Sequence, residues 1–260
     1  MTTPPPLAGF HHLTMIASAP GLNVQFYRDL LGMRLVKKTV NFDDPGSYHL
    51  YYGDEAGVPG TLMTFFAWPN ALRGTRGVGE VTRLGLRTPR GADAASQEPD
   101  GLQIDLAEGP SRLESIEMTV ARREPTEAFL RDRLGFELEA DGSLRLGEAR
   151  VLVREDPEGA RGHQSAGSVH HVAWSVPSDE AELQWQTRLR ESGVDVTPVR
   201  DRQYFHSIYF REPGGVLFEI ATDPPGFAID EAPEHLGERL RLPAWMEPDR
   251  PAIEAVLPKI

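Results

Sequence analysis

Two pairs of neighbouring histidines and one glutamate are the residues of this chain best suited to chemistry. His11 and His12 form the first pair, His170 and His171 form the second, and Glu219 lies within a hydrophobic stretch near the C-terminal end. An ionised carboxylate among hydrophobic residues is costly unless a cation or a proton neutralises it. Because the chain has no cysteine, a transition metal would have to be held by histidine, aspartate or glutamate side chains.

The segments that carry these residues belong to a recurring pattern of one strand, one helix and three strands. The residue types and spacing of the first copy predict strands at 9–17, 34–41, 48–52 and 61–66 and a helix at 22–31. The last copy has predicted strands at 168–176, 194–199, 207–211 and 216–221 and a helix at 180–191. A weaker copy covers 113–155, and a shortened one has strands at 82–87 and 102–106 with the loop 88–101 in place of a helix. The chain therefore reads as four βαβββ units, the second of them truncated.

Superposing the first unit on the last places the chemically distinctive residues at matching positions. The two histidine pairs coincide, and Thr64 coincides with Glu219. Side chains alternate along a strand, so His12 and His171 are expected to share the inward face with these two positions. The third unit has no histidine at the corresponding positions, in segments 115–117 and 151–153. We therefore expect one metal site, built by the first and last units from His12, His171 and Glu219.

The number of ligands separates the reactions that such a site could support. Two histidines and one carboxylate with open positions opposite suit a non-haem Fe(II) oxygenase, whereas four protein ligands suit a Lewis-acid isomerase. Thr64 would be a poor fourth ligand, although a three-ligand zinc site with a bound water stays open. The structural alternative is that the histidines only pack and that Glu219 forms a buried salt bridge with Arg202 or Arg211.

Composition limits the remaining classes of function. A chain of 260 residues can form one large or two medium domains, and we expect a division into 1–109 and 110–260. The formal net charge of −12 argues against nucleic acid or an anionic membrane as the main partner. No apolar run is long enough to span a membrane and no signal peptide is recognisable, so a cytoplasmic location is the expectation.

Four such units resemble the α+β vicinal oxygen chelate fold, whose superfamily contains glyoxalase I, bleomycin-resistance proteins and extradiol dioxygenases. Within it, several segments are similar to the hydroquinone-type ring-cleaving dioxygenases: 36–45, 48–55, 59–66, 201–205 and 211–219. The resemblance implies an Fe(II) enzyme, with Mn(II) as the alternative metal, that opens a small aromatic substrate with O₂. It allows a homo-oligomer. The chain departs from this group in its shortened second unit.

Carried over residue by residue, the resemblance implies ligands at His12, His171 and Glu219. It also implies catalytic roles for a second set of residues: His11, Thr14, His170, Arg202 and Tyr209. His11 or His170 would accept the proton released when the substrate binds, Arg202 would stabilise the resulting anion, and Tyr209 would donate a hydrogen bond. His11 and His170 alternate away from the ligands on their strands, so both need a local twist or a bulge to contribute.

The remaining expectations concern the pocket and the tail. The aromatic pocket candidates are Tyr51, Trp174, Phe205 and Phe218, while His206 is a weaker candidate for the site. We expect His49, His163 and His235 to be surface or structural residues, and the segment after Ala221 to wrap one of the sheets. The alternative functions are a glyoxalase-like isomerase or lyase using Ni²⁺ or Zn²⁺, and a metal-free small-molecule-binding resistance protein.

Overall fold

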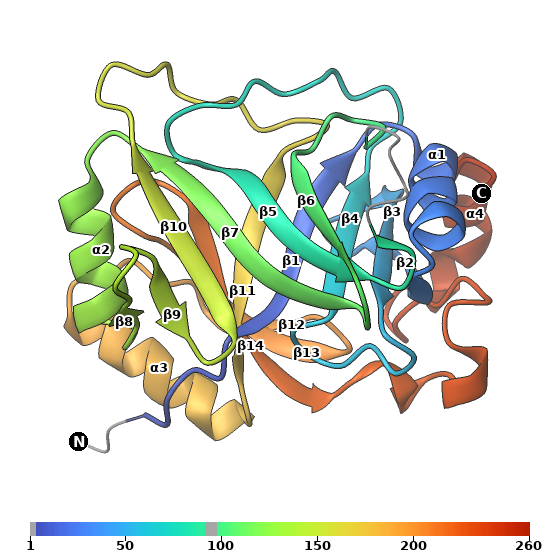
Figure 1. The fold of residues 1–260 in the computed structure, drawn as a ribbon. Helices are drawn as coiled ribbons and strands as arrows, with labels where there is room; N and C mark the ends of the chain where they lie inside the picture. Colours follow the sequence, from blue (N-terminus) through green and yellow to red (C-terminus); the bar gives the residue numbers. More distant parts are fainter. Residues whose placement is uncertain (1–3, 92–97) are drawn as a thin grey trace.

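The strands form two sheets, each assembled from segments that are distant in the sequence (Figure 1). The computed structural model describes residues 4–91 and 98–260. The eight-stranded sheet has the order β12 (Arg200–Asp201), β13 (Phe205–Arg211), β14 (Leu217–Pro225), β11 (Val169–Val176), β1 (Phe10–Ala17), β4 (Leu62–Ala67), β3 (Asp44–Gly53) and β2 (Arg34–Asn41). The six-stranded sheet has the order β6 (Ile104–Glu108), β5 (Glu80–Thr88), β7 (Arg112–Val120), β10 (Ala149–Glu155), β9 (Leu144–Leu146) and β8 (Glu137–Leu138).

The eight-stranded sheet is built symmetrically about its centre. There β1 and β11 pair antiparallel, and each is flanked by a parallel partner, β4 or β14, and then by an antiparallel strand, β3 or β13. The first and last units therefore occupy equivalent halves of one sheet. The second unit contributes only β5 and β6 to the other sheet. The predicted α+β fold of four βαβββ units with a truncated second unit is confirmed.

Helices lie where the sequence predicts them in all three complete units. α1 (Pro20–Val24) continues as a π-helical segment, Gln25–Leu30, and the chain leaves it at Gly32, whose φ of +73° favours glycine. α2 (Arg123–Asp132) belongs to the third unit. α3 (Asp179–Glu191) starts after Ser178, whose side chain accepts a hydrogen bond from the Ala181 amide, as expected of an N-cap.

Three local predictions differ from the structure or fall outside it. The predicted strand at 194–199 is wrong: only Arg200–Asp201 pairs with β13, and Pro198 lacks the amide that a ladder needs. The predicted strand 48–52 is longer than expected, because β3 begins at Asp44. Part of the predicted loop 88–101, residues 92–97, falls outside the described residues.

The two faces of the eight-stranded sheet have different roles. One face carries alternating hydrophobic residues that form the large core together with α1, α3 and the six-stranded sheet; on β1 these are Leu13 and Met15. The opposite face carries His12 and Thr14 of the same strand, next to a smaller cluster that includes Tyr51 and Phe205. Strand alternation thus separates the core from the candidate site.

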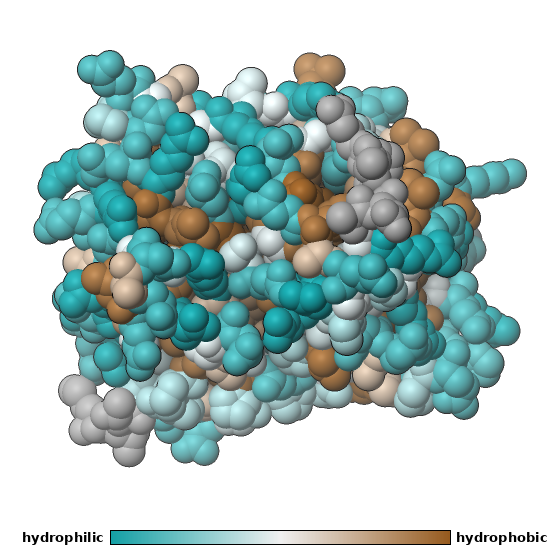
Figure 2. All heavy atoms as spheres, viewed as in Figure 1, coloured by the Kyte–Doolittle hydropathy of each residue, from teal (hydrophilic) through white to brown (hydrophobic). Residues whose placement is uncertain are grey.

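The molecular surface opposite this site is mostly polar. The view of Figure 1 has the six-stranded sheet in front, and Figure 2 shows mainly hydrophilic side chains on that side, with small hydrophobic patches between them. Within residues 4–91 and 98–260, no helix is both long and apolar enough to span a membrane.

The C-terminal tail wraps the eight-stranded sheet, as the sequence predicts, and ends in α4 (Arg250–Val256). A wholly buried lysine, Lys37 on β2, anchors it. The Lys37 Nζ lies 3.1 Å from the carbonyl of Phe227, 2.6 Å from Asp230 Oδ1 and 2.5 Å from Glu231 Oε2. Further along, the Arg241 amide donates to the carbonyl of Lys38. The tail is therefore fixed to β2 by charge as well as by packing.

Replacing Lys37 by methionine should lower the free energy of unfolding by about 3 kcal/mol, because it leaves the buried Glu231 carboxylate without its closest cation. Lys38→Met on the same strand is the matched control. Lys38 is partly exposed and forms no ion pair among the described residues, so its replacement should change stability by no more than about 0.5 kcal/mol. Equal losses in urea unfolding of the two variants would contradict a structural role for the buried ion cluster.

Candidate metal centre

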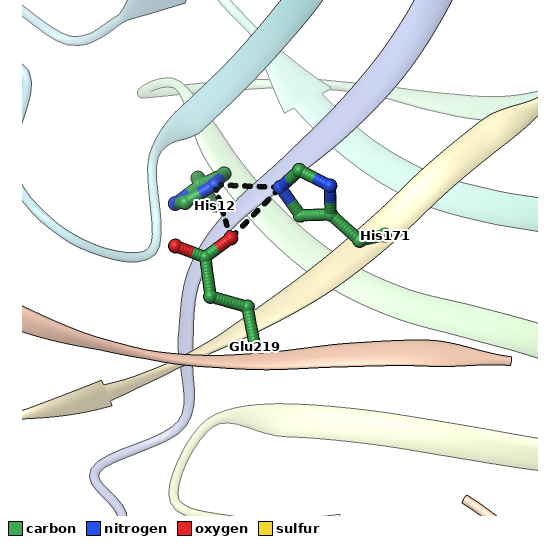
Figure 3. Close-up of side chains that lie close together, drawn as sticks. All are labelled: His12, His171 and Glu219. Atoms are coloured by element: carbon green, nitrogen blue, oxygen red, sulfur yellow. Dashed lines mark hydrogen bonds and ion pairs between the residues drawn. The ribbon is translucent and has the colours of Figure 1, made fainter. Parts of the chain in front are cut away.

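Three buried side chains from neighbouring strands meet at the centre of the eight-stranded sheet (Figure 3). His12 lies on β1, His171 on β11 and Glu219 on β14. The two Nε2 atoms are 3.3 Å apart, and Glu219 Oε2 lies 3.5 Å from His12 Nε2 and 2.8 Å from His171 Nε2. The structure therefore brings together residues that are up to 207 positions apart (219 − 12) and that the sequence predicts as one ligand set.

The geometry of this cluster fits a divalent transition metal. Ligand bonds of about 2.1 Å at right angles place neighbouring ligand atoms about 3 Å apart, close to the separations seen here. Glu219 is fully buried, yet neither of its carboxylate oxygens has a hydrogen-bond donor with acceptable geometry among the described residues. Two imidazoles and one carboxylate form the donor set that non-haem iron sites use.

Burial and mutual proximity set the protonation of the cluster. Burial alone would raise the pKa of Glu219, but the adjacent His12 and His171 outweigh it, so its pKa lies well below the ordinary value. Burial lowers the pKa of His171, against the opposing effect of Glu219. An ionised carboxylate beside an imidazole kept neutral is the state in which both groups can bind a cation.

His11 and His170 reach the cluster through two β-bulges. Between the pairs Phe10↔Trp174 and His12↔Ala173, His11 is the extra residue on β1, and His170 is the extra residue on β11 in the equivalent place. The His11 and His12 Nδ1 atoms are 2.8 Å apart, and so are those of His170 and His171. A proton on the ligand Nδ1 then donates to the preceding histidine, which leaves each ligand Nε2 lone pair directed at the cluster.

Burial lowers the pKa values of both of these histidines. Burial and the charge of His12 lower the pKa of His11 to about 3, and burial and His171 lower the pKa of His170 to about 3. Both imidazoles are therefore neutral at pH 7. Their hydrogen bonds orient His12 and His171, and a general-base role for either histidine stays a prediction.

The Thr14 and Thr64 hydroxyls are hydrogen-bonded to each other rather than to the candidate metal ligands. Their hydroxyl oxygens are 2.7 Å apart, and Thr64 Oγ1 is also 2.9 Å from His49 Nε2. Both threonines are fully buried. A neutral hydroxyl is already a poor metal ligand. The Thr64 hydroxyl is less available still, because it is hydrogen-bonded to both Thr14 and His49.

Arg202 and Tyr209 line the cavity beside the cluster. Arg202 Nε donates to the Tyr209 hydroxyl at 3.1 Å, and its Nη1 lies 2.9 Å from Asp43 Oδ2. Burial and Glu219 raise the pKa of Tyr209, so its hydroxyl stays protonated. Arg202 thus pairs with Asp43, and Arg211 donates to the Gly215 carbonyl, which leaves the alternative salt bridge with Glu219 unsupported in the described chain.

The cavity itself has a volume of about 20 Å³. Its walls come from the first and last units: His12, Asn41, Phe42, His49, Tyr51, His171, Arg202, Phe205, Tyr209 and Glu219. Tyr51 and Phe205 line it as predicted. Trp174 and Phe218 do not, because both point to the opposite face of the sheet and belong to the large core, so their prediction as pocket residues is wrong.

Of the four remaining histidines, His49 lines the cavity against expectation, and the other three do not line it. His49 is 8% exposed and lines the cavity, although we expect a surface or structural role for it from the sequence. Its alternation with Tyr51 on a predicted strand was the available signal. His206 pairs with Asp179 of α3, His163 with the backbone of Thr75, and His235 with Glu238.

Comparisons with known proteins agree with this architecture. The family model "Glyoxalase/Bleomycin resistance protein/Dioxygenase superfamily" matches residues 112–220. The chain is 39% identical to MhqO of Bacillus subtilis (strain 168), provisionally named a ring-cleaving dioxygenase, over 95% of this chain and 94% of that protein. It is 29% identical to the chlorohydroquinone/hydroquinone 1,2-dioxygenase of Sphingobium indicum, over 95% of each chain.

A solved structure is similar over almost the full length. It is the crystal structure of a protein from Bacillus subtilis subsp. subtilis str. 168, provisionally named a dioxygenase, with a TM-score of 0.90 and 37% identity, covering 98% of each chain. Similarity at this level over nearly the entire chain extends well beyond the stretch matched by the family model. The chain therefore belongs to the glyoxalase/bleomycin resistance protein/dioxygenase superfamily.

Proposed function

We propose that this protein is an Fe(II)-dependent ring-cleaving dioxygenase that opens hydroquinone-type aromatic rings with O₂, with Mn(II) as the alternative metal. The observation that carries the proposal is the buried set of His12, His171 and Glu219, three ligand groups converging on one point. Its chemical context comes from relatives named as dioxygenases that align over 95% of the chain.

His12, His171 and Glu219 would hold the metal, which when bound acidifies a coordinated hydroxyl and exchanges electrons with the ring and O₂. Each imidazole is oriented by the histidine before it, so removing His11 or His170 would loosen a ligand without removing it. The hydrophobic cluster behind Phe205 and Tyr51 excludes water from this side of the site.

Arg202 and Tyr209 would act on the oxygen atoms of the substrate. The partly buried guanidinium keeps its positive charge next to the cavity and would stabilise an ionised hydroxyl. The Tyr209 oxygen accepts hydrogen bonds from Arg202 Nε and from Ser207 Oγ at 3.0 Å. Since both of its lone pairs are engaged, its proton is left to be donated to an oxygen inside the cavity.

A substrate ring requires the cavity to widen. A cavity of about 150 Å³ is known to hold benzene, whereas this one measures about 20 Å³. Most of the wall belongs to strands of the central sheet, which hydrogen bonds fix on both sides. Asn41 and Phe42 instead lie at the β2–β3 turn, and Arg202 lies just before β13, so these residues are the ones that can move.

The other two functions receive less support. A glyoxalase-like isomerase would need a fourth protein ligand, and within the described residues the cluster of histidine and acidic groups has three members, while the Thr64 hydroxyl is engaged elsewhere. A metal-free binding protein would have no use for a buried carboxylate without donors. Metal analysis of the protein purified without added metal discriminates between iron, nickel and zinc.

Fe(II) added under anaerobic conditions should raise the melting temperature of the protein. A ligand present at a hundred times its dissociation constant stabilises the folded state by about 2.7 kcal/mol. Glu219→Gln removes the charged ligand and should abolish this shift. Glu182→Gln is the matched control, since burial raises the pKa of Glu182 to about 8 and leaves it mostly neutral at pH 7, outside the site. An undiminished shift in Glu219→Gln would contradict the ligand assignment.

The reconstituted enzyme should consume O₂ with methylhydroquinone, and Glu219→Gln should lower the rate by more than about a hundredfold, since even substitutions behind a ligand cost 10- to 100-fold. Hydroquinones also reduce O₂ without ring opening, so the product made under ¹⁸O₂ is examined by mass spectrometry for two labelled oxygen atoms. Uptake that Glu219→Gln leaves unchanged, or a product that retains its ring, would rule out the dioxygenase function.

A further inference from the structure

Two buried polar residues of the cavity wall have no part in the proposed mechanism. His49 and Tyr51 lie two positions apart on β3, so their side chains share the face that carries the candidate metal centre. Tyr51 is 1% exposed. Burying a hydroxyl and an imidazole in a wall that hydrophobic residues could also form is costly unless their polar atoms are used.

The two side chains belong to a series of hydrogen bonds that runs across neighbouring strands of the sheet. The Tyr51 hydroxyl is 2.9 Å from His49 Nδ1, His49 Nε2 is 2.9 Å from Thr64 Oγ1, and Thr64 Oγ1 is 2.7 Å from Thr14 Oγ1. The strand register agrees, because Tyr51 pairs with Thr64 and Thr64 pairs with Thr14. Both ring nitrogens of His49 are therefore occupied, and the imidazole is held rigidly.

The Tyr51 hydroxyl can form further hydrogen bonds besides the one with His49. A neutral imidazole donates from one nitrogen and accepts at the other, so Tyr51 either donates to His49 Nδ1 or accepts from it. In the first case both oxygen lone pairs are left over, and in the second case the hydroxyl proton and one lone pair. His49 is the single hydrogen-bond partner of this hydroxyl within the described chain.

The symmetry of the sheet gives Tyr51 a counterpart with an assigned role. Tyr51 is opposite Thr64 on β4, and Tyr209 is opposite Glu219 on the equivalent strand β14. Two positions earlier on each strand stands the residue that contacts the tyrosine hydroxyl, which is His49 in one half and Ser207 in the other. The two tyrosines thus enter the cavity from opposite halves of the sheet.

Tyr51 approaches from the side remote from most of the ligands. Its strand β3 is separated from β1 by β4, while β11 and β14, which carry His171 and Glu219, lie on the other side of β1. With about 4.8 Å between neighbouring strands, β3 is roughly 10 Å from β1. Under the proposed function, this strand order favours contact between Tyr51 and a part of the substrate that does not itself coordinate the metal.

We propose that Tyr51, positioned by His49, binds the second hydroxyl of the aromatic substrate, the one that is not a metal ligand. The inference rests on the proposed function. It makes this tyrosine a determinant of specificity for rings whose two hydroxyls are far apart, since two adjacent hydroxyls would both lie at the metal. A site built to bond a substrate hydroxyl rejects an analogue that lacks it, because its own polar group is left unpaired.

The test compares hydroquinone with 4-methylphenol, which has a similar size and one hydroxyl. Dissociation constants are measured by anaerobic titration of the Fe(II)-loaded protein. The native protein should prefer hydroquinone at least tenfold, and Tyr51→Phe should weaken hydroquinone binding about tenfold while leaving 4-methylphenol within twofold. Tyr209→Phe should weaken both ligands alike, since it acts on the metal-bound oxygen that both possess.

The role of His49 is tested by the same ratio of dissociation constants, that of 4-methylphenol to that of hydroquinone. A loss of packing alone would not change this ratio. His49→Phe should reduce the preference for hydroquinone, and His49→Gln, which can both donate and accept, should restore part of it. Tyr52→Phe is the matched control: the adjacent tyrosine points to the opposite face and its hydroxyl donates to Asn23 Oδ1, so the ratio should stay unchanged.

The outcomes separate this inference from the proposed function. If the native protein opens hydroquinone but shows no preference over 4-methylphenol, or if Tyr51→Phe and His49→Phe both keep the native ratio, the role of Tyr51 is overturned and the dioxygenase stands. If the native protein fails to open the ring, the proposed function falls first. Melting temperatures of each variant identify a substitution that has merely unfolded the protein, in which case the other variant decides.

Discussion

A carboxylate without hydrogen-bond donors at the centre of a sheet is the constraint on which this structure depends. Glu219 is fully buried, and the nearest charges that the protein can offer it are two imidazoles. Burial opposes the protonation of one of them, His171. An uncompensated buried charge costs several kcal/mol, so the fold retains Glu219 at the expense of stability. A divalent cation removes this conflict, because it neutralises the carboxylate and uses both imidazoles in their neutral state.

The symmetry of the eight-stranded sheet explains how such a site can be built from simple units. Each half supplies one ligand histidine, one bulged histidine before it and one tyrosine facing the cavity. The halves differ at one equivalent position, which is Glu219 in the last unit and Thr64 in the first. Two carboxylates here would give four ligands, whereas one leaves three. Under the proposed function, this single difference between otherwise equivalent halves would set the number of protein ligands, and with it the coordination positions open to substrate and O₂.

Much of this arrangement could be predicted because it follows from the repeat and from strand alternation. The convergence of His12, His171 and Glu219, the strand 34–41 and the placement of this cluster between the first and last units all needed only periodicity and superposition. The prediction that Trp174 and Phe218 line the pocket is wrong, because alternation relative to His171 and Glu219 puts both on the other face of the sheet. Aromatic residue type alone indicates a pocket residue less reliably than position on the strand does.

Other features depend on pairing between strands, which the sequence alone does not specify. The bulges at His11 and His170 are shifts of register between β1 and β11, and a shift appears only when both strands are aligned. His49 becomes part of the site because Thr64 and Thr14 lie next to it across two strands. The 194–199 segment has suitable residue types but contains Pro198, and the partner strand β13 bonds it at few points.

The wall of the small cavity consists of rigid strands and of a few residues in turns and loops. The ligands and both tyrosines are on strands of the central sheet, where movement would break ladder hydrogen bonds. The ion pair that joins the two units over the cavity, Arg202 with Asp43, has a largely exposed carboxylate. Exposed pairs contribute only about 0–1 kcal/mol, so separating this one costs little. Under the proposed function, a ring would thus be admitted by displacing a turn and an arginine while His12, His171 and Glu219 keep their positions, as a reaction at a fixed metal requires.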